Sequence, residues 1–225
     1  TFEDDFSSSA NWTTTGSFSI DTANTEMDFS ETSTGTNRIY ADLTTVSDSA
    51  WVLRAHQVNF STISTYMNLF IGISGTTGAS GRLNSETALI VMKLQDGGDP
   101  NDYFTPMTSN SSIPSNSATS TFSGQLSTGV DYYLELKRTS TTSITISIYT
   151  GSFSGTLVNS LTATISSAIT GLRYLKLFEG QADVPGGVKG IGTIQKIEFW
   201  NGVTSVVAIA GDVKPTNVQV GSRFE

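Results

Sequence analysis

The sequence predicts an all-β protein: a two-sheet antiparallel β-sandwich with a jelly-roll arrangement of strands. Short runs with apolar residues at alternate positions recur through most of the chain, and clusters of Gly, Asn and Ser separate them. Alternation is the pattern of a strand with one buried and one solvated face, and the clusters are typical of turns between antiparallel strands. Because helical periodicity is nearly absent, the strands must pack on one another, which favours a sandwich or barrel.

The strands can be placed in order along the chain. The clearest alternation lies in Thr87–Gln95, with a second in Ile144–Tyr149, where isoleucines occupy one face. The other predicted strands are Ser17–Asp21, Arg38–Leu43, Trp51–Phe60, Tyr66–Ile73, Tyr133–Lys137, Leu157–Ile165, Leu172–Phe178 and Ile194–Trp200. One short helix is expected at Ala79–Leu83, and the Ser/Asn/Thr-rich stretch Thr108–Thr121 is expected to be a long loop.

The chain of 225 residues fits one β-sandwich domain. The alternating pattern stops after Gly202, which predicts a domain over residues 1–202 and a separate segment over 203–225. That segment opens with the apolar run Val206–Ala210 and becomes rich in Gly and Pro. It is expected to be a linker or an assembly strand, which would add to the exposed edge of another copy of the chain.

Composition excludes several classes of protein. The chain has no cysteine, which excludes disulfides and cysteine-ligated zinc, and its 12 basic against 20 acidic residues argue against nucleic-acid binding. No apolar run approaches the ~18–20 residues of a membrane span, so membrane insertion is not expected. Roughly 65 Ser and Thr residues and only 14% charged residues indicate a neutral, hydroxyl-rich surface. We expect an extracellular, cell-surface or virion location.

Several stretches resemble a known superfamily. Phe2–Ser8, followed by Asn11-Trp12, is similar to the first strand of concanavalin A-like lectin/glucanase sandwiches, the laminin-G-like group. Further resemblance lies in Ser49–Arg54, Asp131–Thr139, Gly171–Lys176 and Ile197–Gly202, which are similar to modules of this superfamily in archaeal and viral surface proteins. The resemblance implies a concanavalin A-like jelly roll in which a curved sheet or its rim loops hold a glycan, often with a structural calcium ion.

Catalysis is not expected. Retaining glucanases of this superfamily carry Glu-x-Asp-x-x-Glu on one strand, and no such triplet occurs here. A Ser-His-Asp triad would have to use His56, the single histidine, and no serine lies in a Gly-x-Ser-x-Gly elbow. The sequence therefore favours a non-catalytic module that recognises a glycan or host-surface polymer. The alternative is a structural subunit of a fibre, sheath or virion that assembles through its C-terminal segment.

Polar and aromatic side chains on the solvated strand faces are the candidates for glycan binding. Sugars need aromatic stacking and hydrogen bonds. If several of these strands share one sheet, their side chains would form a polar-aromatic floor; otherwise the aromatic residues simply cover the sheets. The candidate ligand-binding residues are Arg54, His56, Asn68, Lys93, Gln95, Tyr133, Tyr174 and Lys176.

Two segments are candidates for calcium. Within Gln95–Tyr103, oxygen ligands for calcium could come from Asp96, Asp99, Asn101 and Asp102. The same residue types are ordinary in turns. The resemblance implies a second place, where an acid near the first strand meets an acid on the last. Here Glu3, Asp4 and Asp5 supply the first half, but Thr193–Glu198 lacks the expected Asp-Asp pair.

Overall fold

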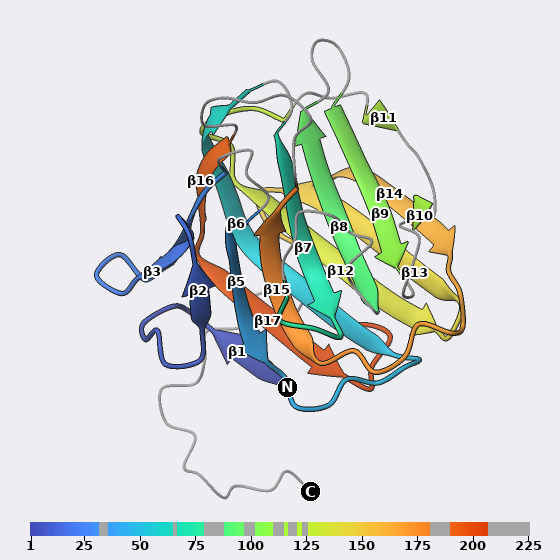
Figure 1. Cartoon of the computed structure of the whole chain (residues 1–225). Coiled ribbons are helices and arrows are strands. Elements are labelled where there is room, and N and C mark those ends of the chain that lie inside the picture. Colours follow the sequence, from blue (N-terminus) through green and yellow to red (C-terminus); the bar gives the residue numbers. More distant parts are fainter. Residues whose placement is uncertain are drawn as a thin grey trace, which may run out of the picture.

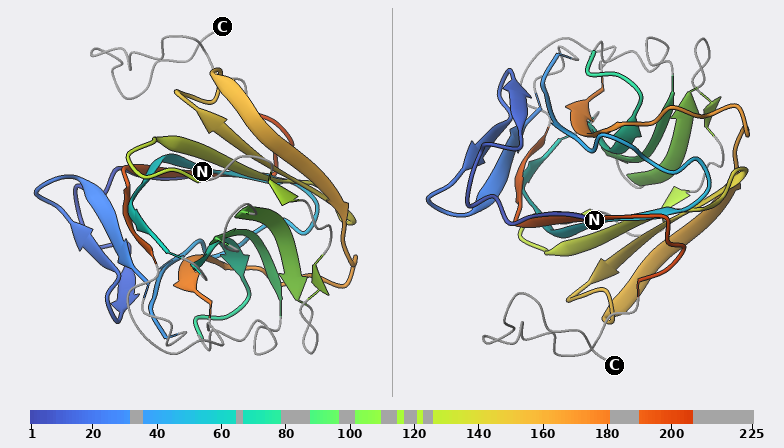
Figure 2. Two further views of the ribbon diagram at one scale, coloured as in Figure 1. Left: turned by 90° about the horizontal axis from the view of Figure 1, so that it is seen from above. Right: turned by 90° about the horizontal axis from the view of Figure 1, so that it is seen from below.

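The computed structural model describes residues 1–31, 36–64, 67–78, 88–96, 102–109, 115–116, 121–122, 126–180 and 190–206. Two antiparallel β-sheets pack face to face in this part of the chain (Figure 1), which confirms the predicted sandwich. Figure 2 shows the two layers from both ends, with the N-terminus at the rim of the sandwich. No helix among these residues is long and apolar enough to cross a membrane.

The first sheet has nine strands, and its longest strand, β6, forms the centre. In order they are β14 (Thr156–Thr164), β13 (Ser143–Thr150), β12 (Tyr132–Ser140), β6 (Trp51–Ile63), β16 (Gly190–Ile194), β4 (Glu26–Ser30) and β3 (Ser19–Asp21), with β17 (Lys196–Asn201) also on β6 and β1 (Phe2–Asp4) on β17. The first half of β6 pairs with β17 and the second half with β16. Gln57, with φ 49°, lies between the halves. The outer face therefore has two regions beside β6, one next to β17 and one next to β16.

The second sheet has eight strands. In order they are β10 (Ser115–Asn116), β9 (Asp102–Ser109), β8 (Leu89–Asp96), β7 (Asn68–Ser74), β15 (Tyr174–Glu179), β5 (Arg38–Asp42) and β2 (Thr13–Thr15), with β11 (Thr121–Phe122) also paired to β9. The β8–β9 connection lies at the end of this sheet where β7 begins, because Asn68 is the cross-strand partner of Gln95.

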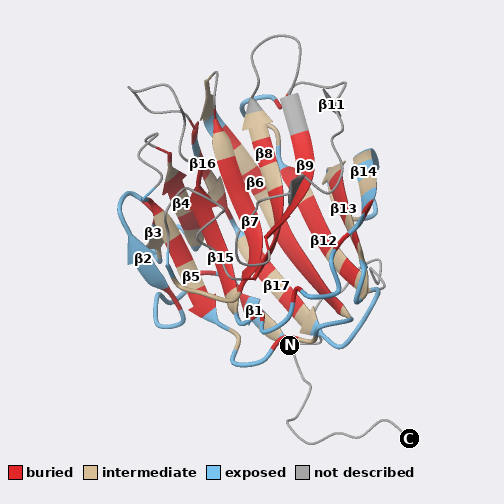
Figure 3. Ribbon diagram, turned by 45° about the vertical axis from the view of Figure 1, so that its right-hand side comes forward, coloured by how far each residue is buried: buried red, intermediate tan, exposed pale blue. Residues whose placement is uncertain are grey.

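The core lies between the sheets, where the apolar faces predicted from alternation meet (Figure 3). Ile144, Ile146 and Ile148 of β13 are fully buried there, as are Ile90 and Met92 of β8. Each such side chain contributes about 1.5–3 kcal/mol through removal of apolar surface from water. Because side chains alternate along a strand, the residues between these positions point to the outer face of their sheet.

The strands that were not predicted include β4, β9 and most of β16. β9 contains Pro106, which has no N–H for a ladder and argues against a strand. β9 continues to Ser109, so the prediction of a loop is wrong for Thr108 and Ser109. β10 and the first residue of β11 also fall within this stretch, and residues 110–114 and 117–120 lie outside the described residues, as does the helix expected at Ala79–Leu83.

Candidate functional site

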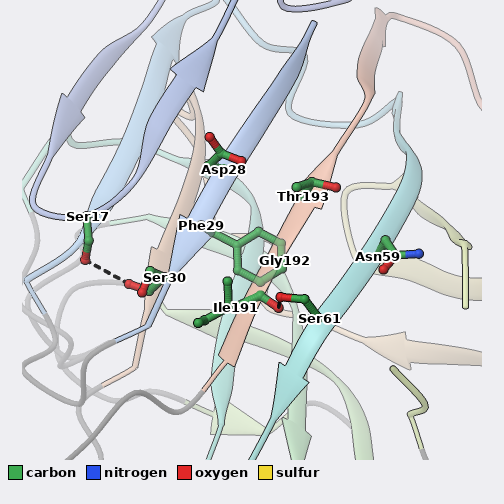
Figure 4. A pocket seen from close by; sticks show the side chains of 9 residues that line it. All are labelled: Ser17, Asp28, Phe29, Ser30, Asn59, Ser61, Ile191, Gly192 and Thr193. Carbon is green, nitrogen blue, oxygen red and sulfur yellow. Dashed lines mark hydrogen bonds between the residues drawn. The ribbon is translucent and has the colours of Figure 1, made fainter. Parts of the chain in front are cut away.

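The outer face of the nine-stranded sheet is hollowed where β4, β16 and β6 lie side by side (Figure 4). We call this hollow the β16 groove; its volume is about 340 Å³. It is lined by Ser17, Asp28, Phe29, Ser30, Asn59, Ser61, Ile191, Gly192 and Thr193. These residues come from segments far apart in sequence, so only the sheet topology brings them together.

The register of the strands arranges the lining side chains in two rows. Asp28, Thr193 and Asn59 are consecutive cross-strand partners, and they form one row. Ser30 and Ile191 are partners in the second row, which Ser61 extends by donating from Oγ to the Ile191 carbonyl at 3.3 Å. Figure 4 shows both rows crossing β4, β16 and β6, one beside the other. Outward-facing residues of one strand lie about 6.6 Å apart, which sets the spacing of the rows.

Gly192 forms the floor between the rows. A Cβ atom at this position would lie 2.0 Å from the Asn59 carbonyl oxygen and 2.5 Å from Cζ of Phe29. No side chain fits there, so the ring of Phe29 fills the space below Gly192. Phe29 is itself held edge-to-face against Phe60, with ring centroids 5.6 Å apart. The floor is therefore built from backbone and packed aromatic rings.

The electrostatics of the groove are set by Asp28. Its carboxylate makes no hydrogen bond within the described part of the chain, and burial, followed by the charge of Asp21, raises its pKa above the usual value. Asn59 donates from Nδ2 to Asp131 at 2.8 Å, which leaves its amide oxygen as an acceptor. The lining contains no Lys or Arg, and Ile191 is 37% exposed. The groove thus offers hydrogen-bond acceptors beside an apolar surface, with negative charge.

The sequence-predicted ligand residues do not share one sheet. Three of them, Arg54, His56 and Tyr133, lie on the nine-stranded sheet. The other five lie on the eight-stranded sheet: Asn68, Lys93, Gln95, Tyr174 and Lys176. The expected single floor is therefore not formed, because the strands that carry it belong to opposite layers.

Arg54 and His56 are engaged by groups of the protein itself. Arg54 donates from Nε to Glu135 at 2.7 Å, and its guanidinium lies 4.4 Å from the ring centroid of Phe153. Phe153 also packs edge-to-face on His56 and on Tyr133, with ring centroids 4.8 and 5.4 Å apart. Sequence analysis missed Phe153 because it lies in the turn between β13 and β14, where no alternation marks a face.

On the eight-stranded sheet the predicted residues are spread over both ends. Asn68 and Gln95 are cross-strand partners near the β8–β9 connection, while Tyr174 packs against Tyr40 at the other end. Lys176 is fully buried and donates to the carbonyl of Gly78, so it is closed to a ligand. The middle of this face is apolar and buried, formed by Phe70, Leu89, Val91, Met107 and Phe178.

Lys93 lies beside that buried apolar cluster. Burial lowers the pKa of its ammonium, and the charge of Glu31 partly offsets this effect. Its cross-strand partner on β7 is Phe70. Lys93, Asn68 and Gln95 are all half-buried, and these three of the predicted residues lie at the same end of the sheet.

The segment predicted to bind calcium is the connection between β8 and β9. Asp96 ends β8, Asp102 begins β9, and the two are cross-strand partners. Their side chains, and the whole of Asp99 and Asn101, lie outside the described residues. Within the described part of the chain, no group of three or more His, Cys, Asp or Glu side chains gathers as a metal site.

The resemblance implies a calcium ion at the edge of the sandwich, between an acid near the first strand and an acid on the last. In this structure the ammonium group of Lys196 lies between two such acids. Glu3 and Glu198 are cross-strand partners, and Nζ of Lys196 lies 2.6 Å from Glu3 and 2.7 Å from Glu198. Burial would raise the pKa of Glu198, but His56, at 2.6 Å, and Lys196 outweigh it and lower that pKa to about 2. These residues do not fit a calcium site, because both carboxylates are already neutralised by a side chain.

Asp4 and Asp5 serve local structure at the same edge. Asp4 is buried and accepts hydrogen bonds from the Phe6 amide at 2.7 Å and from Nδ2 of Asn11 at 2.9 Å. Asp5 accepts from the amide of Ser7 at 3.1 Å.

No protein-family model and no curated protein matches this sequence. Solved structures do match its fold. The VIP36 exoplasmic/lumenal domain, in a Ca²⁺/Man3GlcNAc-bound form, has a TM-score of 0.58 at 11% identity, covering 89% of each chain. Lectin UEA-II complexed with galactose has a TM-score of 0.57 at 14% identity, covering 88% of this chain and 96% of that one.

A phage protein is also similar. The CBM2 module of the evolved Dit of Lactobacillus casei BL23 phage J-1 has a TM-score of 0.53 at 13% identity, covering 88% of this chain and 93% of that one. Together these likenesses show that the chain has the concanavalin A-like lectin fold.

Proposed function

We propose that the protein is a non-catalytic carbohydrate-binding module that holds an uncharged sugar in the β16 groove. The observation that carries the proposal is the row Asp28, Thr193 and Asn59, which lies beside the exposed Ile191 on the same face of the sheet. Sugar hydroxyls would donate to the Asp28 carboxylate and the Asn59 amide oxygen, while the apolar C–H face of the ring would lie against Ile191. The groove is built before binding, so little entropy is lost in ordering it.

Charge selects the class of sugar. Asp28 and Asp21 would repel a carboxylate, sulfate or phosphate group, and no cation lines the groove to compensate. The sugars named with the two similar lectins, galactose and Man3GlcNAc, are uncharged. A neutral glycan on a cell surface or extracellular polymer suits the groove best. The similar phage module supports a location on a virion or another extracellular particle.

The groove is not arranged for glycoside hydrolysis. That reaction uses two carboxyl groups on either side of the scissile bond, and Asp28 is the one carboxylate among the lining residues. Glu135, on the same sheet, is neutralised by Arg54 and Lys137 at 2.7 and 2.9 Å. Binding without turnover is therefore the function we assign.

A glycan array tests this proposal. The full chain should bind neutral glycans and leave sialylated or sulfated ones unbound. Asp28→Asn should remove most of that signal, because an amide cannot replace the carboxylate as a double acceptor. Asp42→Asn is the matched control: Asp42 pairs with the exposed Arg173 on the opposite sheet, and its loss should leave binding unchanged. An array with no neutral-glycan signal would overturn the proposal.

We also propose that calcium binds the β8–β9 connection. The cross-strand pairing of Asp96 with Asp102 supports this, because it holds two of the four predicted oxygen-donor residues at the base of one hairpin. Calcium should then raise the melting temperature and an excess of chelator should lower it. Asp99→Asn should blunt this response. A melting temperature unmoved by chelator would refute the calcium site and leave the sugar site untouched.

A further inference from the structure

The chain turns back over its own domain after the last strand. β17 ends at Asn201, and Gly202, with φ 79°, adopts the left-handed conformation that a sharp reversal needs. Val206 then lies over the outer face of the nine-stranded sheet, where its carbonyl accepts a hydrogen bond from Nη2 of Arg54 at 3.0 Å. Arg54 is the cross-strand partner of Glu198 in β17. The segment therefore runs back beside the strand that it has just left.

Arg54 is held in place to make this contact. Its Nε donates to Oε2 of Glu135 at 2.7 Å, and Nζ of Lys137 lies 2.9 Å from Oε1 of the same carboxylate. The guanidinium lies 4.4 Å from the ring centroid of Phe153 and 5.7 Å from that of Trp200. We call Arg54, Glu135, Phe153 and Trp200 the Arg54 clamp. A rigid, planar donor between two rings loses little freedom when it binds a carbonyl.

The hydrogen bond to the Val206 carbonyl matters because the donor, Arg54, is buried. Arg54 is only 8% exposed and Glu135 only 3%. A buried guanidinium needs its donors satisfied, because a buried donor without a partner destabilises the folded state. The Val206 carbonyl satisfies one of these donors. The C-terminal segment thus supplies an acceptor to a buried donor of Arg54.

The segment also matches the surface in polarity. From Val203 onward it reads Val-Thr-Ser-Val-Val-Ala-Ile-Ala, which becomes wholly apolar from Val206. Next to the clamp, Phe153 contacts Tyr149, whose cross-strand partner on the edge strand β14 is Leu157. Leu157 and its neighbour Val158 are 52% and 38% exposed. An apolar segment anchored at Arg54 has apolar surface within reach.

We propose that the Arg54 clamp is the docking site of the chain's own C-terminal segment, residues 203–210, and that it fixes where the chain leaves the domain. The clamp recognises backbone, through a carbonyl, and the adjoining rings and aliphatic side chains cover the apolar residues. Any module or partner that follows would then leave from the outer face of the nine-stranded sheet. The proposal does not depend on sugar binding.

Trp200 reports directly on this contact, because Trp51 and Trp12, the other two tryptophans, are buried. In the full chain, Arg54→Lys keeps the charge beside Glu135 but loses the planar fork that reaches the Val206 carbonyl. Quenching by acrylamide should rise and the emission should shift to longer wavelength. A chain ending at Gly202 should show the same change, and one ending at Gly211 should behave as the full chain. Trp200→Phe should abolish all of these differences.

The two changes should also be coupled. If the clamp acts on the segment, Arg54→Lys should add little further quenching in the chain that ends at Gly202. Equal quenching of the full and the shortened chain would overturn the proposal, as would additive effects of the two changes. Light scattering should show that the full chain is a monomer. A dimer that dissociates when residues 203–225 are removed would mean that the segment is exchanged between two copies. That result would contradict docking of the segment on its own domain. Should the shortened chain fail to fold, Arg54→Lys in the full chain decides.

Discussion

Lys196 ties the first strand of the domain to the last. Its ammonium contacts Glu3 on β1 and Glu198 on β17, and the same Glu198 contacts His56 on β6. Three strands of one sheet are therefore joined by these side-chain contacts. The side chain of Glu198 is only 14% exposed, so its own contacts are poorly screened by water, whereas Glu3 is 60% exposed.

Replacement of Lys196 by Met should lower the free energy of unfolding by about 1–2 kcal/mol, because Glu198 loses a charged partner in a partly buried position. Urea unfolding measures this. The control is Arg173→Met, which breaks an ion pair between side chains that are 48% and 44% exposed; such pairs contribute little. Equal losses in the two variants would contradict the account of this edge.

Glu198 should make stability dependent on pH. Its pKa is lowered from 4.5 to about 2 in the folded protein. The contribution of its charge is therefore complete above pH 4.5 and is lost as the pH falls from there toward 2. The gap in unfolding free energy between the native chain and Glu198→Gln should be wide at neutral pH and should shrink in acid. A gap that stays constant over this range would refute the assignment.

At the scale of elements, the β16 groove depends on a position that only glycine can occupy. Gly192→Ala would drive a methyl group into the Asn59 carbonyl and the Phe29 ring, which would lie 2.0 and 2.5 Å from the new Cβ. We expect a loss of about 1–3 kcal/mol in unfolding free energy, together with weaker sugar binding. Gly78→Ala is the control, because the nearest atom there is 3.9 Å away. Unchanged stability of Gly192→Ala would contradict the described floor.

Strong periodicity made some elements predictable and its absence hid others. β13 carries isoleucines at alternate positions and β8 carries Ile90, Met92 and Leu94, so the faces of both strands could be assigned from sequence. β4 alternates Met27 and Phe29 with polar residues, but over only five residues. β16 is built on glycines at Gly190 and Gly192, which have no side chain to mark a face. β4 and β16 form the groove together with β6, and because these two strands were not predicted the sequence did not reveal it.

At the scale of the whole molecule, the sandwich was predictable but the neighbours of each strand were not. Which strands pair is decided by contacts between residues far apart in sequence, such as Thr193 with Asn59. Alternation indicates which side chains face outward, yet it does not say on which sheet. Arg54 and Lys93 lie opposite the core residues of their strands, as alternation indicates, but the two strands belong to different layers.

A titration of the full chain with its neutral glycan, followed by backbone amide shifts in NMR, tests the central claim most directly. The β16 groove predicts saturable shifts at Asp28, Asn59, Gly192 and Thr193, and no such shifts in Asp28→Asn. Shifts gathered instead at Asn68, Lys93 and Gln95 would place the sugar on the eight-stranded sheet and contradict the groove as the binding site.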